Sequence, residues 1–169
     1  MKNIALVGFM GTGKSTIAAL LAKELQAEYI DLDGKIEEKE GMDIVDIFSQ
    51  KGELYFRKVE KDIVAKISRD EDKIIACGGG VVLDEENVET IKKNGFMICL
   101  EATPEVILKR TKNYKHRPLL NVADPKSKID ELLKKRKPYY AKADYTLDTS
   151  GLSTHEVVAQ ILIWLEGKT

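Results

Sequence analysis

The feature that most constrains the fold is a glycine-rich octapeptide that follows a short apolar run near the start of the chain. Residues 8–15 read Gly-Phe-Met-Gly-Thr-Gly-Lys-Ser and match the pattern G-x-x-x-x-G-K-[ST]. The apolar run Ile4 to Val7 precedes it, and an amphipathic segment from about Lys14 to Gln26 follows it. Glycines let the backbone fold tightly, so that consecutive N–H groups and the positive end of a helix face an anion. The pattern therefore predicts a strand, a phosphate-binding loop and a helix.

Two side chains at the end of this loop have expected roles in binding a nucleotide. Lys14 is expected to bridge the β- and γ-phosphates of a nucleotide, and the Ser15 hydroxyl to bind Mg²⁺, which prefers oxygen ligands. GTPases and motor ATPases share the loop, so nucleotide binding alone does not identify a kinase. A guanine-reading N-K-x-D sequence is missing, because the nearest fragment, residues 127–130, lacks the asparagine. The loop residues expected to contact the nucleotide are Gly11, Thr12, Gly13, Lys14, Ser15 and Thr16.

Short apolar runs alternate with segments of helical periodicity along the rest of the chain. This alternation is typical of βαβ units that form a parallel sheet. We expect one α/β domain over residues 1–169, with three α/β/α layers and a last helix from about Thr154 to Leu165. The predicted strands are Asn3 to Val7, Glu28 to Asp31, Lys73 to Cys77, Phe96 to Leu100 and Tyr145 to Asp148.

Two stretches interrupt the alternation, and such interruptions are where substrate contacts usually lie. Residues 33–60 contain short helical pieces broken by Gly41 and Gly52, and we expect them to form a substrate-binding subdomain. Residues 112–124 form a polar, basic loop without apolar periodicity, which makes them a candidate lid.

The composition excludes several classes of partner. Lys and Arg number 27 against 28 Asp and Glu, so no basic excess favours nucleic acid or an anionic membrane. No apolar run approaches the roughly 18 residues of a membrane span, and we expect a soluble, cytoplasmic protein. Cys77 and Cys99 lie in apolar runs without metal-type spacing, so we expect buried thiols in a reducing compartment.

An acidic pair, Asp31 and Asp33, stands at the end of the second predicted strand. Strand alternation is expected to orient both carboxylates to one side of the carboxyl edge of the sheet, where doubly wound folds bind ligands. One can hold the Mg²⁺ shell through water, and the other can orient an attacking hydroxyl or accept its proton. The alternative is a helix N-cap at Asp33 with Asp31 solvated.

Glycines and arginines supply a second set of candidates. Gly78-Gly79-Gly80 follows the third predicted strand and either exposes its backbone N–H groups to a ligand or forms a flexible turn. Arg57 and Glu60 lie three apart on a predicted helix, so Glu60 can hold Arg57 in place. Arg136 is expected to close the helix after the lid, with Pro138 marking its end. Guanidinium groups can grip a planar carboxylate through paired hydrogen bonds, although either arginine alone would be an ordinary surface residue.

The order of these motifs resembles that of the shikimate kinase family, from Asn3 to Glu166. The resemblance implies a nucleoside-monophosphate-kinase-like P-loop fold with a five-stranded parallel sheet in the order 2-3-1-4-5 and a mobile lid. It implies transfer of the γ-phosphoryl group of MgATP to the 3-hydroxyl of shikimate, in aromatic amino-acid biosynthesis, by a chain expected to be a monomer. The matching segments are Gly-Phe-Met-Gly-x-Gly-Lys-Ser-Thr at 8–16, Asp-x-Asp at 31–33, Phe-Arg-x-x-Glu at 56–60, Gly-Gly-Gly at 78–80, Arg-Pro-Leu-Leu at 117–120 and Arg-x-Pro-x-Tyr at 136–140.

The resemblance also implies roles for single residues. The implied catalytic residues are Lys14, Asp33 and Arg117, of which Lys14 and Arg117 bind the γ-phosphate. The implied magnesium ligands are Ser15 and Asp31, and Arg110 is the implied adenine-stacking residue. Phe48 and Phe56 resemble the family's apolar wall around the ring, although two aromatics at helical spacing also serve as core. The loop of residues 148–153 lacks the proline often found near adenine in the family. The implied shikimate-binding residues are Asp33, Arg57, Gly78, Gly79, Gly80, Arg136, Phe48, Phe56 and Glu60.

Direct in-line transfer without a phospho-enzyme is expected, because His116, His155 and the cysteines have better structural explanations as surface and core residues. Two other functions stay open at this point. One is another small-metabolite kinase on the same scaffold, such as a gluconate kinase, and the other is a nucleotide-binding regulatory protein that hydrolyses little.

Overall fold

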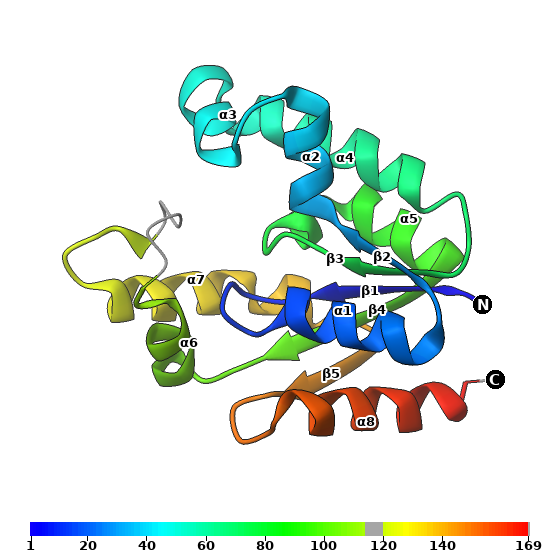
Figure 1. Ribbon diagram of the computed structural model, residues 1–169. Coiled ribbons are helices and arrows are strands. Elements are labelled where there is room, and N and C mark those ends of the chain that lie inside the picture. Colours follow the sequence, from blue (N-terminus) through cyan, green and yellow to red (C-terminus); the bar gives the residue numbers. More distant parts are fainter. Residues whose placement is uncertain (114–119, 169) are drawn as a thin grey trace.

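The computed structural model describes residues 1–113 and 120–168, which form a central sheet between two layers of helices (Figure 1). Neighbouring strands all pair in parallel, and their order across the sheet is β2-β3-β1-β4-β5. This is the order expected from the sequence. The strands are β1 (Asn3–Val7), β2 (Glu28–Asp31), β3 (Lys73–Ala76), β4 (Gly95–Glu101) and β5 (Tyr145–Asp148).

Eight α-helices and one short 3₁₀ helix surround the sheet in the described part of the chain. Helices α1 and α8 cover one face, while α4, α5 and α7 cover the other. The helices are α1 (Lys14–Leu25), α2 (Leu32–Glu40), α3 (Ile44–Lys51), α4 (Glu53–Ile67), α5 (Glu85–Asn94), α6 (Pro104–Thr111), α7 (Pro125–Tyr140) and α8 (Thr154–Glu166), with the 3₁₀ helix η1 at Val81–Leu83.

The central strands are apolar except at their ends, because helices bury both of their faces. In β1, Ile4 and Leu6 pack with α1 and α8, whereas Ala5 and Val7 pack on the opposite side. Asn3 is buried at the start of the strand, and its side-chain oxygen accepts a hydrogen bond from the backbone N–H of Lys73 at 3.0 Å. The sheet thus brings the carboxyl ends of all its strands to one edge, at the left in Figure 1.

The segment after β2 forms helices α2 and α3 and leads into α4, as predicted from its glycines. Gly41 ends α2 with a φ of 66°, and Gly52 separates α3 from α4 with a φ of 84°. Lys51 and the hydroxyl of Tyr55 both bond the carboxylate of Glu40, at 2.9 and 2.8 Å. These contacts join the three helices into one unit beside the sheet.

The prediction that Pro138 ends its helix was wrong, because α7 continues through Pro138 to Tyr140. Proline removes one backbone donor, but here it lies in the last turn, and the backbone N–H of Ala141 still bonds the carbonyl of Lys137 at 3.0 Å. Arg136 and Tyr140 on either side of the proline are both buried. Packing of the last turn therefore outweighs the local preference of proline.

Cys77 and Cys99 are free, buried thiols, as expected. Burial raises the pKa of Cys99 to about 12 and that of Cys77 further, so neither forms a reactive thiolate near neutral pH. Among the described helices, none combines the length and the apolar character of a membrane span.

Candidate active site

The phosphate-binding loop curls around the end of β1 because three of its glycines adopt left-handed backbone angles. The φ values are 138° at Gly8, 78° at Gly11 and 93° at Gly13. A Cβ atom on Gly8 would collide with the carbonyl oxygen of Leu100 on the adjacent strand. Gly13 is also the N-cap of α1, so the loop leads directly into the positive end of that helix. The predicted sequence of strand, tight glycine loop and helix is thus present in the fold.

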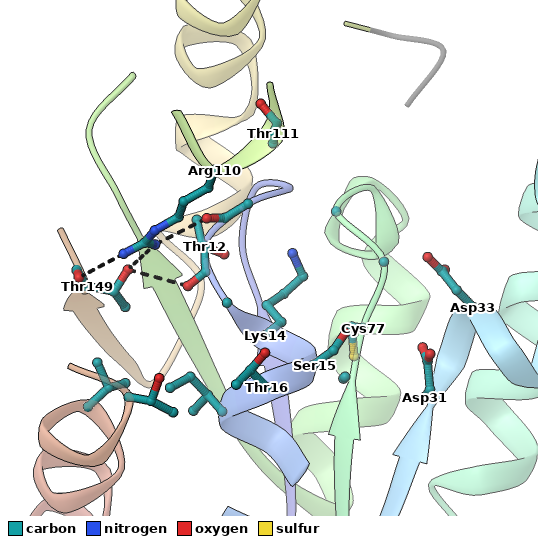
Figure 2. Close-up of a pocket in the computed structure, with 18 of the residues that line it drawn as sticks. Thr12, Lys14, Ser15, Thr16, Asp31, Asp33, Cys77, Arg110, Thr111 and Thr149 are labelled. Atoms are coloured by element: carbon teal, nitrogen blue, oxygen red, sulfur yellow. Dashed lines mark hydrogen bonds between the residues drawn. The ribbon is translucent and has the colours of Figure 1, made fainter. Parts of the chain in front are cut away.

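A cleft of about 510 Å³ opens in front of this loop (Figure 2). Its walls come from the phosphate-binding loop, the carboxyl ends of β2 and β3, and the segment after β5. This is the sheet edge at which doubly wound folds bind ligands. The lining residues are Gly11 to Ile17, Asp31, Asp33, Ala76 to Gly79, Arg110, Thr111, Thr149, Leu152, Thr154 and Val157.

Lys14 extends back along the loop into the cleft. Its ammonium group donates hydrogen bonds to the carbonyls of Gly8 and Phe9, both at 2.8 Å. These bonds hold a positive charge beside the loop amides, where the phosphates of a nucleotide would lie. The hydroxyl-bearing residues Ser15 and Thr16 follow at the start of α1 and line the same cleft.

Asp31 and Asp33 face the cleft from the side opposite Arg110 (Figure 2). The reason given for this from strand alternation was wrong: β2 ends at Asp31, and Asp33 lies in the first turn of α2. The first turn of α2, rather than the alternation of β2, therefore directs the Asp33 carboxylate toward the cleft. The alternative of an N-cap at Asp33 is also wrong, because Asp31 occupies that position without a side-chain capping bond.

The glycine loop, residues 78–80, connects β3 to η1 and lies between the two arginines. A Cβ on Gly80 would meet the guanidinium of Arg57, with Cζ at 2.7 Å, and a Cβ on Gly79 would lie 3.3 Å from Nη1 of Arg136. A Cβ on Gly78 would lie 2.9 Å from Oδ1 of Asp33. The side chains of Asp33, Arg57 and Arg136 thus lie close to the backbone of this loop, and a Cβ at Gly78 or Gly80 would require Asp33 or Arg57 to move.

Arg57 is fixed by its own helix. Its Nη1 donates to Oε1 of Glu60 at 2.9 Å, as their spacing predicted, and its Nη2 lies 3.5 Å from the carboxylate of Glu53. Arg136 reaches the loop from α7, is only 7% exposed, and holds its guanidinium 5.7 Å from the ring centroid of Phe9. Arg57 and Arg136 come from different helices, and both guanidinium groups lie beside the glycine loop.

Arg110 spans the other end of the cleft. It donates to the carbonyl of Gly11 at 3.2 Å, and to the hydroxyl and carbonyl of Thr149 at 3.1 and 3.3 Å. Thr149 is buried, and its hydroxyl also bonds the carbonyl of Glu101 at 2.9 Å. Leu152 and Val157 add apolar surface to the same cleft. A flat guanidinium and apolar side chains in one cleft suit a planar base, and the role of Arg110 stays a prediction.

Phe48 and Phe56 form a pair with ring centroids 4.6 Å apart. Phe56 is part of the buried core, Phe48 packs against it, and neither lines the cleft. The ring of Phe56 lies 5.1 Å from the guanidinium carbon of Arg57. Phe56 therefore packs against Arg57 and Phe48 packs against Phe56, while contact of either ring with a ligand stays a prediction.

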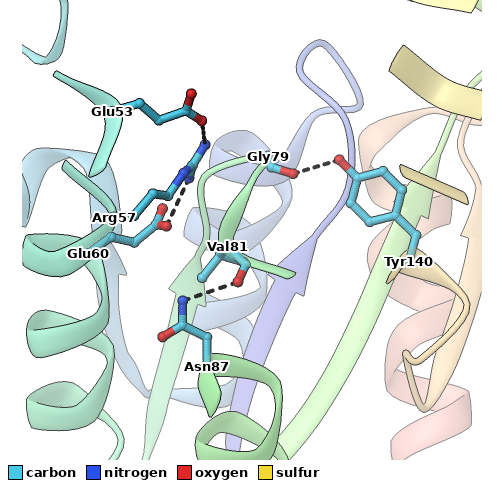
Figure 3. A network of polar contacts seen from close by, with 7 residues as sticks. All are labelled: Glu53, Arg57, Glu60, Gly79, Val81, Asn87 and Tyr140. Atoms are coloured by element: carbon cyan, nitrogen blue, oxygen red, sulfur yellow. Dashed lines mark hydrogen bonds and ion pairs between the residues drawn. The ribbon is translucent and has the colours of Figure 1, made fainter. Parts of the chain in front are cut away.

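Sequence analysis missed two buried residues that hold the glycine loop, Tyr140 and Asn87 (Figure 3). The Tyr140 hydroxyl donates to the carbonyl of Gly79 at 2.7 Å, and the Asn87 amide donates to the carbonyl of Val81 at 3.1 Å. Tyr140 belonged to a recognised motif without a role, whereas Asn87 lies in a helix that carries no motif. The predicted γ-phosphate ligand Arg117 lies outside the described residues, as do the other residues of the lid candidate from 114 to 119.

Comparisons with known proteins agree with this geometry. A family model described as "Shikimate kinase" matches residues 10–166. The shikimate kinases of Caldanaerobacter subterraneus subsp. tengcongensis and Thermodesulfovibrio yellowstonii are 48% and 47% identical to the chain over 162 residues, covering 96% of it and 95% and 94% of their own lengths.

Among solved structures, the shikimate kinase from Acinetobacter baumannii in complex with shikimate superposes with a TM-score of 0.95 at 36% identity. The match covers 100% of this chain and 95% of that one. A phosphate-binding loop, an acidic pair and two convergent arginines thus occur on a shared backbone. The chain is a kinase with a P-loop fold and belongs to the shikimate kinase family.

Proposed function

We propose that the chain transfers the γ-phosphoryl group of MgATP to the 3-hydroxyl of shikimate, which gives shikimate 3-phosphate and ADP. The observation that carries this proposal is the convergence of Arg57 and Arg136 on one glycine loop, beside the cleft that holds Lys14 and Asp33. Paired guanidinium groups fit an acceptor that bears a planar carboxylate. The named complex of the Acinetobacter baumannii relative with shikimate supports the same acceptor.

The acceptor would lie over the glycine loop with its carboxylate between Arg57 and Arg136. Glu60 would hold Arg57 in the required direction through the 2.9 Å bond. Asp33, close to Gly78, would accept hydrogen bonds from the ring hydroxyls. The arginines would then bind the carboxylate at one end of the acceptor and Asp33 would bind hydroxyls at the other end. This orientation would leave one hydroxyl pointing toward the nucleotide.

ATP would bind along the other half of the cleft, with its phosphates against the loop amides and Lys14 and its base near Arg110. Phosphoryl transfer spreads negative charge over the γ-oxygens, and catalysis consists of positioning and charge stabilisation. Lys14 would stabilise that charge from the loop. Arg117, assigned from its motif, would do so from the lid at 112–124.

The residues of the cleft fit a magnesium ion. The Ser15 hydroxyl and the Asp31 carboxylate both line it and supply oxygen donors. No group of three or more His, Cys, Asp or Glu side chains suited to a metal occurs in the described part of the chain. This composition matches Mg²⁺, which usually takes one or two protein oxygens together with water and phosphate oxygens. When bound, Mg²⁺ neutralises charge on the β- and γ-phosphates.

Asp33 would orient the attacking hydroxyl and accept its proton as the new O–P bond forms and the bond to ADP breaks. Direct in-line transfer requires no phosphorylated side chain. The buried thiols of Cys77 and Cys99 have strongly raised pKa values, so neither thiol is a suitable nucleophile. The inserted helices within 33–60 would carry Asp33 and Arg57 of the acceptor site, while the glycine loop and Arg136 would supply the rest.

A coupled assay of ADP release with a panel of hydroxy acids tests the proposal. We expect rapid turnover with shikimate, little with gluconate, and little in the absence of an acceptor. Equal or faster turnover with gluconate would favour the other small-metabolite kinase. ATP binding without acceptor-dependent turnover would favour a regulatory protein.

A further inference from the structure

The side chain of Tyr140 makes a long-range contact with the glycine loop. Tyr140 stands at the end of α7 and is 5% exposed, and its hydroxyl donates to the carbonyl of Gly79, 61 positions earlier, at 2.7 Å. The Asn87 amide donates to the carbonyl of Val81, the residue after the loop (Figure 3). Side chains thus bond the carbonyls of the residues on either side of Gly80, Gly79 in the loop and Val81 at the start of η1.

A hydrogen bond to the Gly79 carbonyl fixes the orientation of the peptide bond between Gly79 and Gly80, which would otherwise flip easily. Gly80 has a φ of −101°, and a flip of the preceding peptide plane would bring this angle to positive values. Most residues resist positive φ, but glycine adopts it freely, so a peptide between two glycines flips at little cost. A hydrogen bond to the Gly79 carbonyl is present in only one of the two orientations.

The orientation matters because a trans peptide is planar, with its C=O and its N–H pointing in opposite directions. The Gly79 carbonyl points toward Tyr140, so the Gly80 N–H points away from it. Arg57 lies on that opposite side of the loop (Figure 3), with its guanidinium beside Gly80. The bond from Tyr140 therefore directs a backbone donor toward the region where the acceptor carboxylate is proposed to lie.

The same face of α7 carries Arg136, four positions before Tyr140, so both side chains meet Gly79. A shift of α7 would move the arginine and the loop together. Burial raises the pKa of Tyr140 to about 12, an effect that nearby Arg136 opposes. The hydroxyl therefore stays protonated as a donor near neutral pH.

We propose that Tyr140 is a positioning residue for acceptor binding, which locks the Gly79–Gly80 peptide so that its N–H faces the carboxylate held by Arg57 and Arg136. The inference rests on the proposed function, because it concerns the site of the same acceptor. It adds a side chain that touches neither substrate and acts through the backbone.

The test compares Tyr140→Phe with Tyr139→Phe. The adjacent Tyr139 is partly buried and packs its ring 5.8 Å from the ammonium group of Lys142, so its substitution controls for removal of a neighbouring hydroxyl. In Tyr140→Phe we expect the KM for shikimate to rise about fivefold, as for loss of one neutral hydrogen bond, with the KM for ATP within twofold of wild type. Tyr139→Phe should leave both values within twofold.

A second measurement reports on the loop itself. Glycine is present at 12 positions, so ¹⁵N-glycine labelling gives a simple amide spectrum in which Gly80 can be followed. We expect the Gly80 signal of the free protein to shift or broaden in Tyr140→Phe and to keep its position in Tyr139→Phe.

Two results would overturn the inference. One is a Tyr140→Phe variant with an unchanged KM for shikimate and an unchanged Gly80 amide. The other is an equal rise in both KM values together with a lower Tm, which would make Tyr140 a support of the fold only. Failure of the proposed function would look different, since wild-type protein would then not phosphorylate shikimate at all, while the Gly80 signal would still respond to loss of the hydroxyl.

Discussion

Arg57 donates a hydrogen bond to one carboxylate oxygen of Glu60 at 2.9 Å, while the other oxygen, Oε2, is buried and has no hydrogen-bond partner among the described residues. Glu60 is 1% exposed. A carboxylate in this position is stabilised from one side only, and its burial opposes ionisation. The buried Glu60 carboxylate therefore fixes the direction of the Arg57 side chain, although its burial costs the folded state free energy.

The first prediction concerns Glu60 and pH. Burial raises the pKa of Glu60, with Arg57 opposing the rise and the charges of Asp33 and Asp84 adding to it. A pKa of Glu60 that is higher in the folded than in the unfolded state means that the folded state binds the proton more tightly. Proton binding by Glu60 therefore adds to the free energy of unfolding. This addition is complete below the unfolded-state pKa and is lost as the pH rises through the folded-state pKa.

Glu60→Gln removes the pH dependence of the free energy of unfolding that comes from Glu60, because glutamine does not titrate. The free energy of unfolding of the wild type, measured by urea titration, should therefore increase relative to that of Glu60→Gln as the pH falls from 7 toward 4.5. Glu53→Gln, which changes an exposed carboxylate near the same arginine, serves as the control and should show little such trend. A constant difference between wild type and Glu60→Gln across this range would contradict the assignment.

The second prediction separates acceptor binding from nucleotide binding. Arg57→Lys and Arg136→Lys keep the charge but lose the forked donor geometry. Each should raise the KM for shikimate by about 10-fold or more, as expected for loss of a charge-assisted hydrogen bond, and change the KM for ATP far less. Arg69→Lys, at an exposed arginine, should match wild type. Equal weakening of both substrates would remove the arginines from the acceptor site.

The third prediction concerns the space beside Gly80. A methyl group at this position would displace the flexible end of Arg57, whose Nη1 lies 2.6 Å from the ideal Cβ position. Gly80→Ala should thus raise the KM for shikimate by about 10-fold with only a small change in Tm. Gly151→Ala, where a Cβ meets nothing within 4 Å, should behave as wild type toward shikimate. If Gly80→Ala bound shikimate normally, Arg57 could not be a ligand in its present position.

The fourth prediction concerns Arg117, whose role rests on its motif. Arg117→Ala should lower kcat by about 100-fold or more and leave the KM for shikimate nearly unchanged, because the arginine acts on charge that develops in transfer. Lys109→Ala, which removes a positive charge from an exposed lysine of α6, serves as the control and should keep the kcat of the wild type. An unaltered kcat in Arg117→Ala would exclude Arg117 from this role.

The sequence by itself determined the phosphate-binding loop, the parallel sheet and the pairing of Arg57 with Glu60. These features follow from spacing within a few residues: the glycines of residues 8–15, the alternation of apolar runs with helical periodicity, and a three-residue separation on one helix. The order of the strands followed from the resemblance of the motif set to a known family, and the structure confirms it.

Only the tertiary structure decided which side chains meet at the glycine loop. Arg57, Arg136 and Tyr140 come from two helices that approach the loop from different directions, and the contact from Tyr140 to Gly79 spans 61 positions. Pro138 was misjudged for the same reason, since burial of its neighbours outweighed its local preference. Local rules act over one or two turns of chain, whereas these contacts depend on how helices pack on a sheet, which no spacing along the chain encodes.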